Sequence, residues 1–258
     1  MFEKHKVFKA PEDENLEIWR YMDFTKFVSI ISKKTLFFTR ADQLDDKFEG
    51  SLSKHILDPS IEEKATQEQR LQLNKTRERL SSFYKSQRKE IAINCWHMNE
   101  YESAAMWKLY LKSDEGIAIQ STYRKLVDSF DNSDDYHLWV GMVNYIDYNK
   151  KHIPPDNMLY PYIFKRKSFE HEHELRAVIT KNISAKDYPN QIVIGGKNLL
   201  FLPKKGVEIP VNLDVLIEKI YVSPTCEKWF EELVRSMVDK SELRKKVKKS
   251  SLADDPMF

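Results

Sequence analysis

Apolar residues recur along the chain with two spacings, one typical of strands and one typical of helices. Residues 16–21 predict a short strand, and residues 24–31 place four apolar side chains on one face of a helix. Short β-rich runs then alternate with amphipathic segments up to residue 238. Because this alternation lacks the regular spacing of βαβ units, we expect an α+β fold, with mixed or antiparallel central strands and flanking helices.

One segment departs from this alternation. Residues 61–89 are polar and free of Gly and Pro, so they predict a long, mostly exposed helix inserted on the surface of the core. Residues 1–238, with this insertion, are expected to form a single domain. Residues 239–258 are basic and then polar, and we expect this tail to fray.

Composition excludes several classes of protein. The 42 basic and 40 acidic side chains give a net charge of +2, so no overall basic field points to nucleic acid. Cys95 and Cys226 are too few for a disulfide framework or a four-cysteine zinc site. With 6 glycines, neither a P-loop nor a dinucleotide fingerprint can be assembled. No apolar run has the length of a signal peptide or a membrane span, so we expect a cytoplasmic protein without membrane contact.

The most unusual local pattern is a series of charges between residues 165 and 180. Glu170, Glu172 and Glu174 occupy every second position, and Arg176 continues the series. In a strand these side chains would share one face, and the β-rich continuation favours a strand from about Glu172. Like charges at adjacent positions are costly without a compensating cation or ligand, and such crowding raises the pKa of a carboxylate. The alternative is a solvated strand face.

Two further motifs lie near predicted strand ends. Arg20 has a guanidinium that could bind a phosphate or carboxylate, or could pair with Glu17. Ser121 and Thr122 end an apolar strand, where they could orient a ligand or cap the following helix.

Metal sites are not indicated. Residues 42–49 contain four acids, but they lack the glycine and the spacing of a calcium loop. The cysteines and histidines, among them Cys95, His97, His171 and His173, lack zinc spacing. We therefore expect no resident metal.

Several stretches, taken in order, resemble a bacterial and phage family known as domain of unknown function 2971. They are WRYMDFTKFVSIISKKTLFFTRADQLDDKFEG, INCWH, AAMWKLYLKSDEGIAI and FKRKSFEHEHELRAV, which together span most of residues 19–178. Lys47 stands where that family commonly has proline, and Phe169 stands where it commonly has tryptophan. The resemblance names no reaction.

The order of Arg20, the Ser121 and Thr122 pair, and Glu172 with Glu174 is similar to the arginine, serine, glutamate pattern of ADP-ribosyltransferases. The resemblance implies that Arg20 holds the phosphates of NAD and that Ser121 and Thr122 support the nicotinamide ribose. It implies that Glu174 is the catalytic glutamate and that Glu172 helps to activate the acceptor. The middle motif reads Gln-Ser-Thr rather than Ser-Thr-Ser.

The leading hypothesis is therefore an ADP-ribosyltransferase-like enzyme that uses NAD as substrate and modifies a protein or nucleic-acid acceptor. A role in bacterial conflict or phage defence, with an antitoxin or defence-system partner, follows from the resemblance alone. The hypothesis predicts that Arg20, Ser121 and Glu174 converge on one cleft with aromatic walls, for which Trp19, Tyr21 and Phe169 are candidates. The alternatives are a non-catalytic binding or regulatory module with a structural charge network, and a metal-dependent nuclease using the acids of 42–49 with Glu172 and Glu174.

Overall fold

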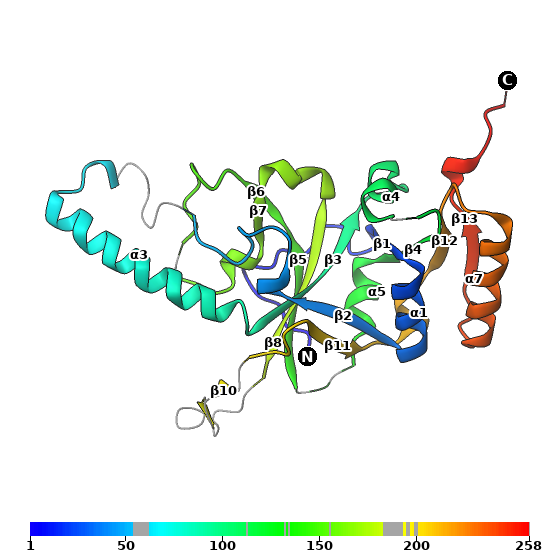
Figure 1. Ribbon diagram of the computed structural model, residues 1–258, viewed down its shortest axis with the longest axis horizontal. Helices are drawn as coiled ribbons and strands as arrows, with labels where there is room; N and C mark the ends of the chain where they lie inside the picture. The colour runs from blue at the N-terminus through cyan, green and yellow to red at the C-terminus, as the bar shows by residue number, and fades with distance from the viewer. Residues whose placement is uncertain are drawn as a thin grey trace.

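The computed structural model describes residues 1–53, 62–111, 113–131, 133, 135–154, 156–182, 193–194, 197–198 and 201–257. These residues form the α+β fold predicted from the sequence, with a mostly antiparallel central sheet and flanking helices (Figure 1). The central strands are β1 (Glu17–Asp23), β2 (Thr35–Arg40), β3 (Ile91–Met98), β4 (Gly116–Thr122), β5 (Tyr136–Met142), β8 (Glu174–Lys181), β11 (Gly206–Pro210), β12 (Lys219–Val222) and β13 (Lys246–Lys249). Two small ribbons are made by β6 (Asn144–Ile146) with β7 (Phe164–Arg166), and by β9 (Val193–Ile194) with β10 (Lys197–Asn198).

The helices connect and cover these strands. The α-helices are α1 (Phe24–Lys33), α3 (Gln67–Gln87), α4 (Ala104–Tyr110), α5 (Tyr123–Asp128), α6 (Leu213–Leu216) and α7 (Lys228–Lys240). Short 3₁₀ turns are η1 (Ala41–Gln43), η2 (Tyr160–Tyr162), η3 (Lys167–Glu172) and η4 (Ser251–Ala253). In the part of the chain that the structure describes, no helix is long and apolar enough to span a membrane.

The helix α1 shows how the local sequence sets an element. Asp23 is the N-cap, and its side chain accepts a hydrogen bond from the backbone N–H of Lys26 at 2.9 Å. Phe27, Ile30 and Ile31 are buried, so the predicted apolar face packs on the sheet. The helix stops where Lys34 takes a left-handed backbone conformation, with φ of 53°.

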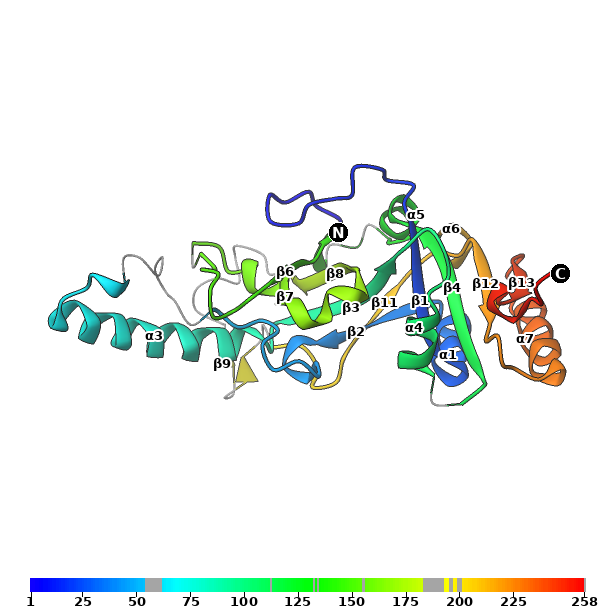
Figure 2. The ribbon, with the colours of Figure 1, turned by 90° about the horizontal axis from the view of Figure 1, so that it is seen from above.

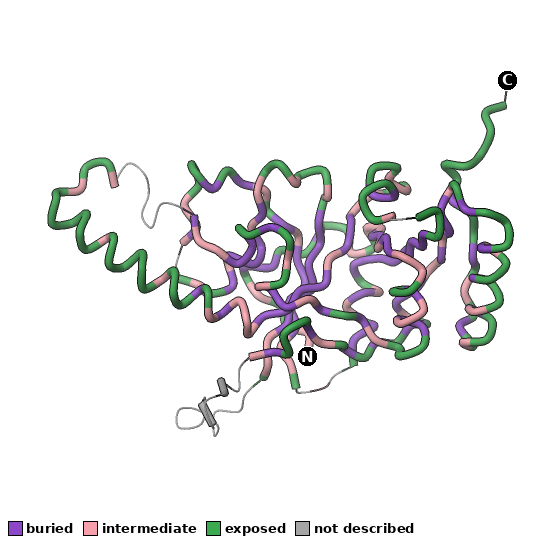
Figure 3. The backbone as a smooth tube through the Cα atoms, in the orientation of Figure 1, coloured by how far each residue is buried: buried purple, intermediate pink, exposed green. Residues whose placement is uncertain are grey.

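The long helix α3 is the predicted surface insertion, and it begins at Gln67, behind a capping box made by Thr66 and Gln69. Figures 1 and 2 show it projecting from one end of the molecule, away from the end that carries α7 and β13. Along most of its length it is exposed, whereas the central strands are buried (Figure 3). Residue 61, where the insertion was expected to begin, lies outside the described residues.

The sheet is covered on both faces near β1. Trp19 and Tyr21 pack with Met106 and Trp107 of α4 in one apolar cluster. Ile18 and Met22, which point to the other side of β1 because strand side chains alternate, belong to the main core with α1 and α7.

The expectation that the C-terminal tail frays is wrong for residues 246–249. They form β13, which pairs in parallel with β12, and Val247 is buried at 5% exposure. Val247 on the inner face of this strand packs in the core, although the segment around it is rich in lysine.

Candidate functional site

The strand β3 has two unlike edges. Along one edge it pairs with β8 without interruption, from Ile91 opposite Thr180 to His97 opposite Glu174. Along the other edge it pairs with β2 only at residues 92–93 and with β1 only at residues 97–98. Within the described residues, positions 94–96 have no strand partner on this second edge. The sheet is therefore split here between β2 and β1, which pair with opposite ends of β3.

Side chains bridge the gap where the main-chain ladder ends. The guanidinium of Arg20 donates from Nη1 to the carbonyl oxygen of Cys95 at 2.7 Å. The amide of Asn94 donates to the carbonyl oxygen of Phe37 on β2 at 2.9 Å. These bonds give the two carbonyl groups a partner, and they connect β3 to β1 and β2 across the split.

A cavity of about 500 Å³ lies at this split. Its walls come from β1, α1, β2, η1, β3, α4, η3, β11 and the start of β8. Its polar lining includes Arg20, Tyr21, His97, Tyr110, Glu172 and Glu174. This size and mixture of aromatic and polar side chains are typical of a small-molecule site.

Arg20 contributes a half-buried cation to the cavity. Its guanidinium lies 5.9 Å from the centre of the Trp96 ring, and burial lowers its pKa. In the described part of the chain its one hydrogen bond is to Cys95, so N–H groups of the planar fork remain for a ligand. The alternative pairing with Glu17 does not form, because Glu17 instead accepts a hydrogen bond from Gln120 at 2.8 Å.

Two of the three candidate aromatic residues line the cavity. Trp19 and Tyr21 do so from the face of β1 opposite to that of Arg20. Burial raises the pKa of Tyr21, so its hydroxyl stays protonated, and that hydroxyl accepts the backbone N–H of Ser103 at 2.8 Å. Phe169 is not part of the lining; it stacks instead under Lys165, 5.0 Å from that ammonium.

The predicted strand face of alternating acids is wrong at its start. Glu170 and Glu172 belong to the 3₁₀ turn η3, and β8 begins only at Glu174. His173 separates η3 from β8, and its left-handed backbone, with φ of 38°, ends the turn. Glu174 and Arg176 do share a strand face, as predicted, and they bind each other directly.

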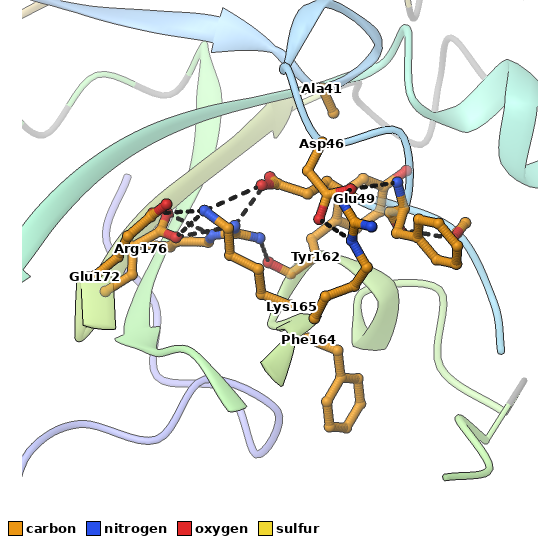
Figure 4. A network of polar contacts seen from close by, with 12 residues as sticks. Ala41, Asp46, Glu49, Tyr162, Phe164, Lys165, Glu172 and Arg176 are labelled. Atoms are coloured by element: carbon orange, nitrogen blue, oxygen red, sulfur yellow. Dashed lines mark hydrogen bonds and ion pairs between the residues drawn. The ribbon is translucent and has the colours of Figure 1, made fainter. Parts of the chain in front are cut away.

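Glu172 and Glu174 are neutralised by a largely buried ion network that includes a lysine (Figure 4). Lys165 lies 2.6 Å from Glu172, 3.0 Å from Glu174 and 3.3 Å from Glu49. Arg176 is fully buried and donates from Nε to Glu174 at 2.8 Å, while its Nη2 lies 2.9 Å from Oε2 of Glu49. The second contact has the distance of an ion pair without the angles of a hydrogen bond. Three carboxylates thus share two cations.

The network separates the pKa values of its acids. Burial alone would raise the pKa of Glu174, but the Arg176 and Lys165 charges outweigh it and lower that pKa to about 2. For Glu49, burial wins over the attraction of Arg176, and its pKa is raised. The prediction that crowding raises a carboxylate pKa therefore does not hold for Glu174, because cations outweigh its acidic neighbours. Glu174 is an ionised carboxylate, suited to offset positive charge rather than to donate a proton.

Ser121 and Thr122 are not brought to the cavity. The hydroxyl of Ser121 is fully buried and donates to the carbonyl oxygen of Leu216 at 2.5 Å. The hydroxyl of Thr122 accepts the backbone N–H of Lys125 at 3.2 Å, so it caps α5. Opposite them in the β1–β4 ladder stand Ile18 and Glu17, at the end of β1 that lies before the split.

Three of the four acids of residues 42–49 are paired with cations, namely Asp42, Asp46 and Glu49. Asp45 is exposed and lines the cavity. Asp42 accepts from Arg40 at 2.6 Å, and Asp46 lies 3.0 Å from Arg166. Over the described ranges, no group of three His, Cys, Asp or Glu side chains is placed to hold a metal ion. The geometry therefore gives the metal-dependent nuclease no support.

Two residues of this region were missed as site residues in the sequence. Lys165 gives no local signal, because Glu172 and Glu174 follow it by seven and nine residues, which is no spacing of neighbouring side chains in a helix or strand, and Glu49 comes from a distant segment. His97 was considered only as a metal ligand, in the run Asn-Cys-Trp-His. It is buried, lines the cavity and stands opposite Glu174 in the β3–β8 ladder.

No family model and no curated protein match the chain, so the resemblance to domain of unknown function 2971 stays a prediction. Solved structures of Thermus sp. 2.9 DarT are similar to it at low identity. The complex with NAD+ has 8% identity and a TM-score of 0.42, over 96% of this chain and 100% of that chain. The complex with ADP-ribosylated ssDNA has 9% identity and a TM-score of 0.41 over the same shares. At this level of likeness, function has to be argued from the cavity's own residues.

Proposed function

We propose that this chain is an ADP-ribosyltransferase-like enzyme that uses NAD as its substrate. The observation that carries the proposal is that Arg20, Glu172 and Glu174 line one cavity together with Trp19 and Tyr21. A cation for phosphates, aromatic surfaces for flat rings and a carboxylate for a ribose are the groups that such a ligand requires.

Arg20 would bind the pyrophosphate of NAD on its side of the split. Its guanidinium is fixed between Cys95 and Trp96, so little side-chain freedom is lost when a phosphate binds. Tyr21 and Trp19 would cover the nicotinamide half from the opposite face of β1.

Glu174 would stabilise the reacting ribose. Departure of nicotinamide leaves an oxocarbenium-like sugar, and an ionised carboxylate beside it offsets the developing positive charge. Arg176 and Lys165 occupy three of the roughly four lone-pair positions of this carboxylate, with contacts of 2.8, 3.1 and 3.0 Å. The Cys95 side chain also hydrogen-bonds this carboxylate, so a ribose hydroxyl would replace that weak thiol donor.

The acceptor would be a protein or a nucleic acid. A place in bacterial conflict or phage defence, with an antitoxin or another defence-system protein as partner, belongs to the same proposal and rests on the family resemblance. A free acceptor is not required for the first test, because water can take the ADP-ribose.

The rival function is a non-catalytic binding or regulatory module, and the buried network favours it. Arg176 and Glu174 are 0% and 2% exposed, and their contacts tie β8 to the loop of Glu49 and to Lys165 of β7. Such a network can serve structure alone. In this reading the cavity has no affinity for NAD.

Calorimetric titration of NAD into the wild-type protein, Arg20→Met and Glu174→Gln separates the two functions, followed by a nicotinamide-release assay on each. We expect the wild type to bind NAD and release nicotinamide, Arg20→Met to bind weakly, and Glu174→Gln to bind without release. Thermal melting of each variant shows whether it is folded. A folded wild type that neither binds NAD nor releases nicotinamide would overturn the proposal in favour of the module.

A further inference from the structure

The tautomer of His97 is fixed by its surroundings. Nδ1 lies 2.6 Å from the carbonyl oxygen of Glu172, and a carbonyl oxygen only accepts hydrogen bonds. The proton of the neutral ring is therefore on Nδ1, and Nε2 carries a lone pair. The ring centres of His173 and Tyr21 lie 6.0 and 6.3 Å from the ring centre of His97, so the imidazole packs between aromatic neighbours.

The lone pair on Nε2 has no partner. His97 is 4% exposed, and Nε2 is buried without a hydrogen bond to any described residue. Burial, reinforced by the charges of His173 and His171, lowers the pKa of the ring, which keeps it neutral. A buried acceptor without a donor is costly in a folded protein. His97 lines the cavity, so a ligand that reaches Nε2 by displacing the atoms over it would supply the missing donor.

The carboxylate of Glu172 is already committed. Its Oε2 accepts a hydrogen bond from the ammonium of Lys165 at 2.6 Å, so this oxygen already has a partner. The backbone of the same residue orients His97. Glu172 is thus suited to position a base, whereas His97 has the free lone pair of one.

From this arrangement we propose that His97, through Nε2, accepts the proton of the attacking nucleophile, and that Glu172 acts as its positioning residue. This inference rests on the proposed function and names a nucleophile class: a hydroxyl, or water, that must lose a proton as it attacks. It differs from the family resemblance, which assigns activation of the acceptor to Glu172.

The step balances without a further reactant. The bond between the ribose carbon C1′ and the nicotinamide nitrogen breaks, and its electron pair leaves with neutral nicotinamide. The oxygen of the nucleophile forms the new bond to C1′, and its proton moves to Nε2 of His97. The imidazolium then returns this proton to water, and Glu174 offsets the charge of the sugar meanwhile.

The test uses full-length protein, NAD and sodium azide, because azide is an anionic nucleophile with no proton to lose. The variant His97→Asn keeps an N–H for the Glu172 carbonyl but lacks Nε2. We expect it to bind NAD within about 3-fold of wild type and to release nicotinamide about 100-fold more slowly, since a general base typically contributes that much or more. Azide should restore release, with ADP-ribosyl azide as a new product detected by mass spectrometry.

The control is Arg20→Met, whose weak NAD binding azide should not change. If His97→Asn does not fold, His97→Gln, which places an amide near the position of Nε2, takes its place in the same assay. Release near the wild-type rate, or a loss that azide does not restore in folded protein, would overturn the role of His97 and leave the proposed function intact. A wild type without nicotinamide release would overturn both.

Discussion

The two edges of β3 both carry charged and polar residues, but these residues have different roles on the two edges. On the β8 edge the ladder is continuous. Arg176 on this edge is 0% exposed and is paired with Glu174 and Glu49. On the β1 and β2 edge the ladder is interrupted, and Arg20 and His97 keep hydrogen-bonding capacity toward a cavity. Glu174 and His97 show the contrast most directly. Glu174 on β8 has three contacts to cations, whereas Nε2 of His97, which stands between Glu174 of β8 and Trp19 of β1, has no partner among the described residues.

This difference teaches that charge in a sequence does not reveal its use. In a buried ion network, removing one partner leaves an uncompensated buried charge and destabilises the fold. An unpaired polar group next to a cavity is a cost that a ligand can relieve. Arg176 on the continuous edge should therefore respond to mutation through stability, and Arg20 on the interrupted edge through binding.

The largest expected effect is on the continuous edge. Arg176→Met should lower the free energy of unfolding by about 3 to 5 kcal/mol, because Glu174 and Glu49 would remain buried with only Lys165 to compensate them. Urea unfolding followed by circular dichroism measures this loss. Arg235→Met, which removes the exposed pair between Arg235 and Glu231, is the matched control and should cost less than about 1 kcal/mol. Equal costs for the two variants would contradict the structural role of the network.

The same network should make stability fall in acid. The pKa of Glu174 is lowered from 4.5 to about 2 in the folded protein, so its contribution is present above pH 4.5 and is lost as the pH falls toward 2. The raised pKa of Glu49 acts in the opposite direction, since its protonation on acidification favours the folded state.

A Glu49→Gln background removes that opposing contribution. We expect the difference in unfolding free energy between Glu49→Gln and Glu49→Gln/Glu174→Gln to shrink, by up to about 2 kcal/mol, from pH 6 to pH 3. Urea unfolding at each pH gives this difference. A gap that stays constant over the range would show that Glu174 does not titrate with a lowered pKa.

On the interrupted edge the expected effect is on binding. Arg20→Met should weaken NAD about 10- to 150-fold, which corresponds to about 1.5 to 3 kcal/mol for lost charge-assisted hydrogen bonds to phosphate. Calorimetry of both proteins measures it. Arg124→Met is the control, because Arg124 is an exposed arginine paired with Glu14 and is not part of the cavity lining. An unchanged NAD affinity in Arg20→Met would remove the cation from the proposed site.

The sequence predicted this molecule best where the signal is local. The apolar spacing of residues 24–31 and the cap at Asp23 were sufficient for α1, and the polar run was sufficient for α3. It was misleading at Glu170 and Glu172, because alternation over so few positions fits a 3₁₀ turn as well as a strand, and the left-handed His173 has no clear signature. Lys165 and His97 were missed in their present roles because tertiary contacts define both.

The smallest expected effect concerns the motif that lies away from the split. Thr122→Ala should lower the free energy of unfolding by about 1 kcal/mol, because the hydroxyl caps α5 through the backbone N–H of Lys125. NAD affinity and nicotinamide release should stay within about 2-fold of wild type, since Thr122 is not part of the cavity lining. Thr122→Ser, which keeps a capping hydroxyl, should retain most of the stability. A tenfold loss of NAD affinity in Thr122→Ala, with Thr122→Ser unaffected, would instead return the ribose-binding role to this hydroxyl and would mean that the ligand extends beyond the cavity at the split.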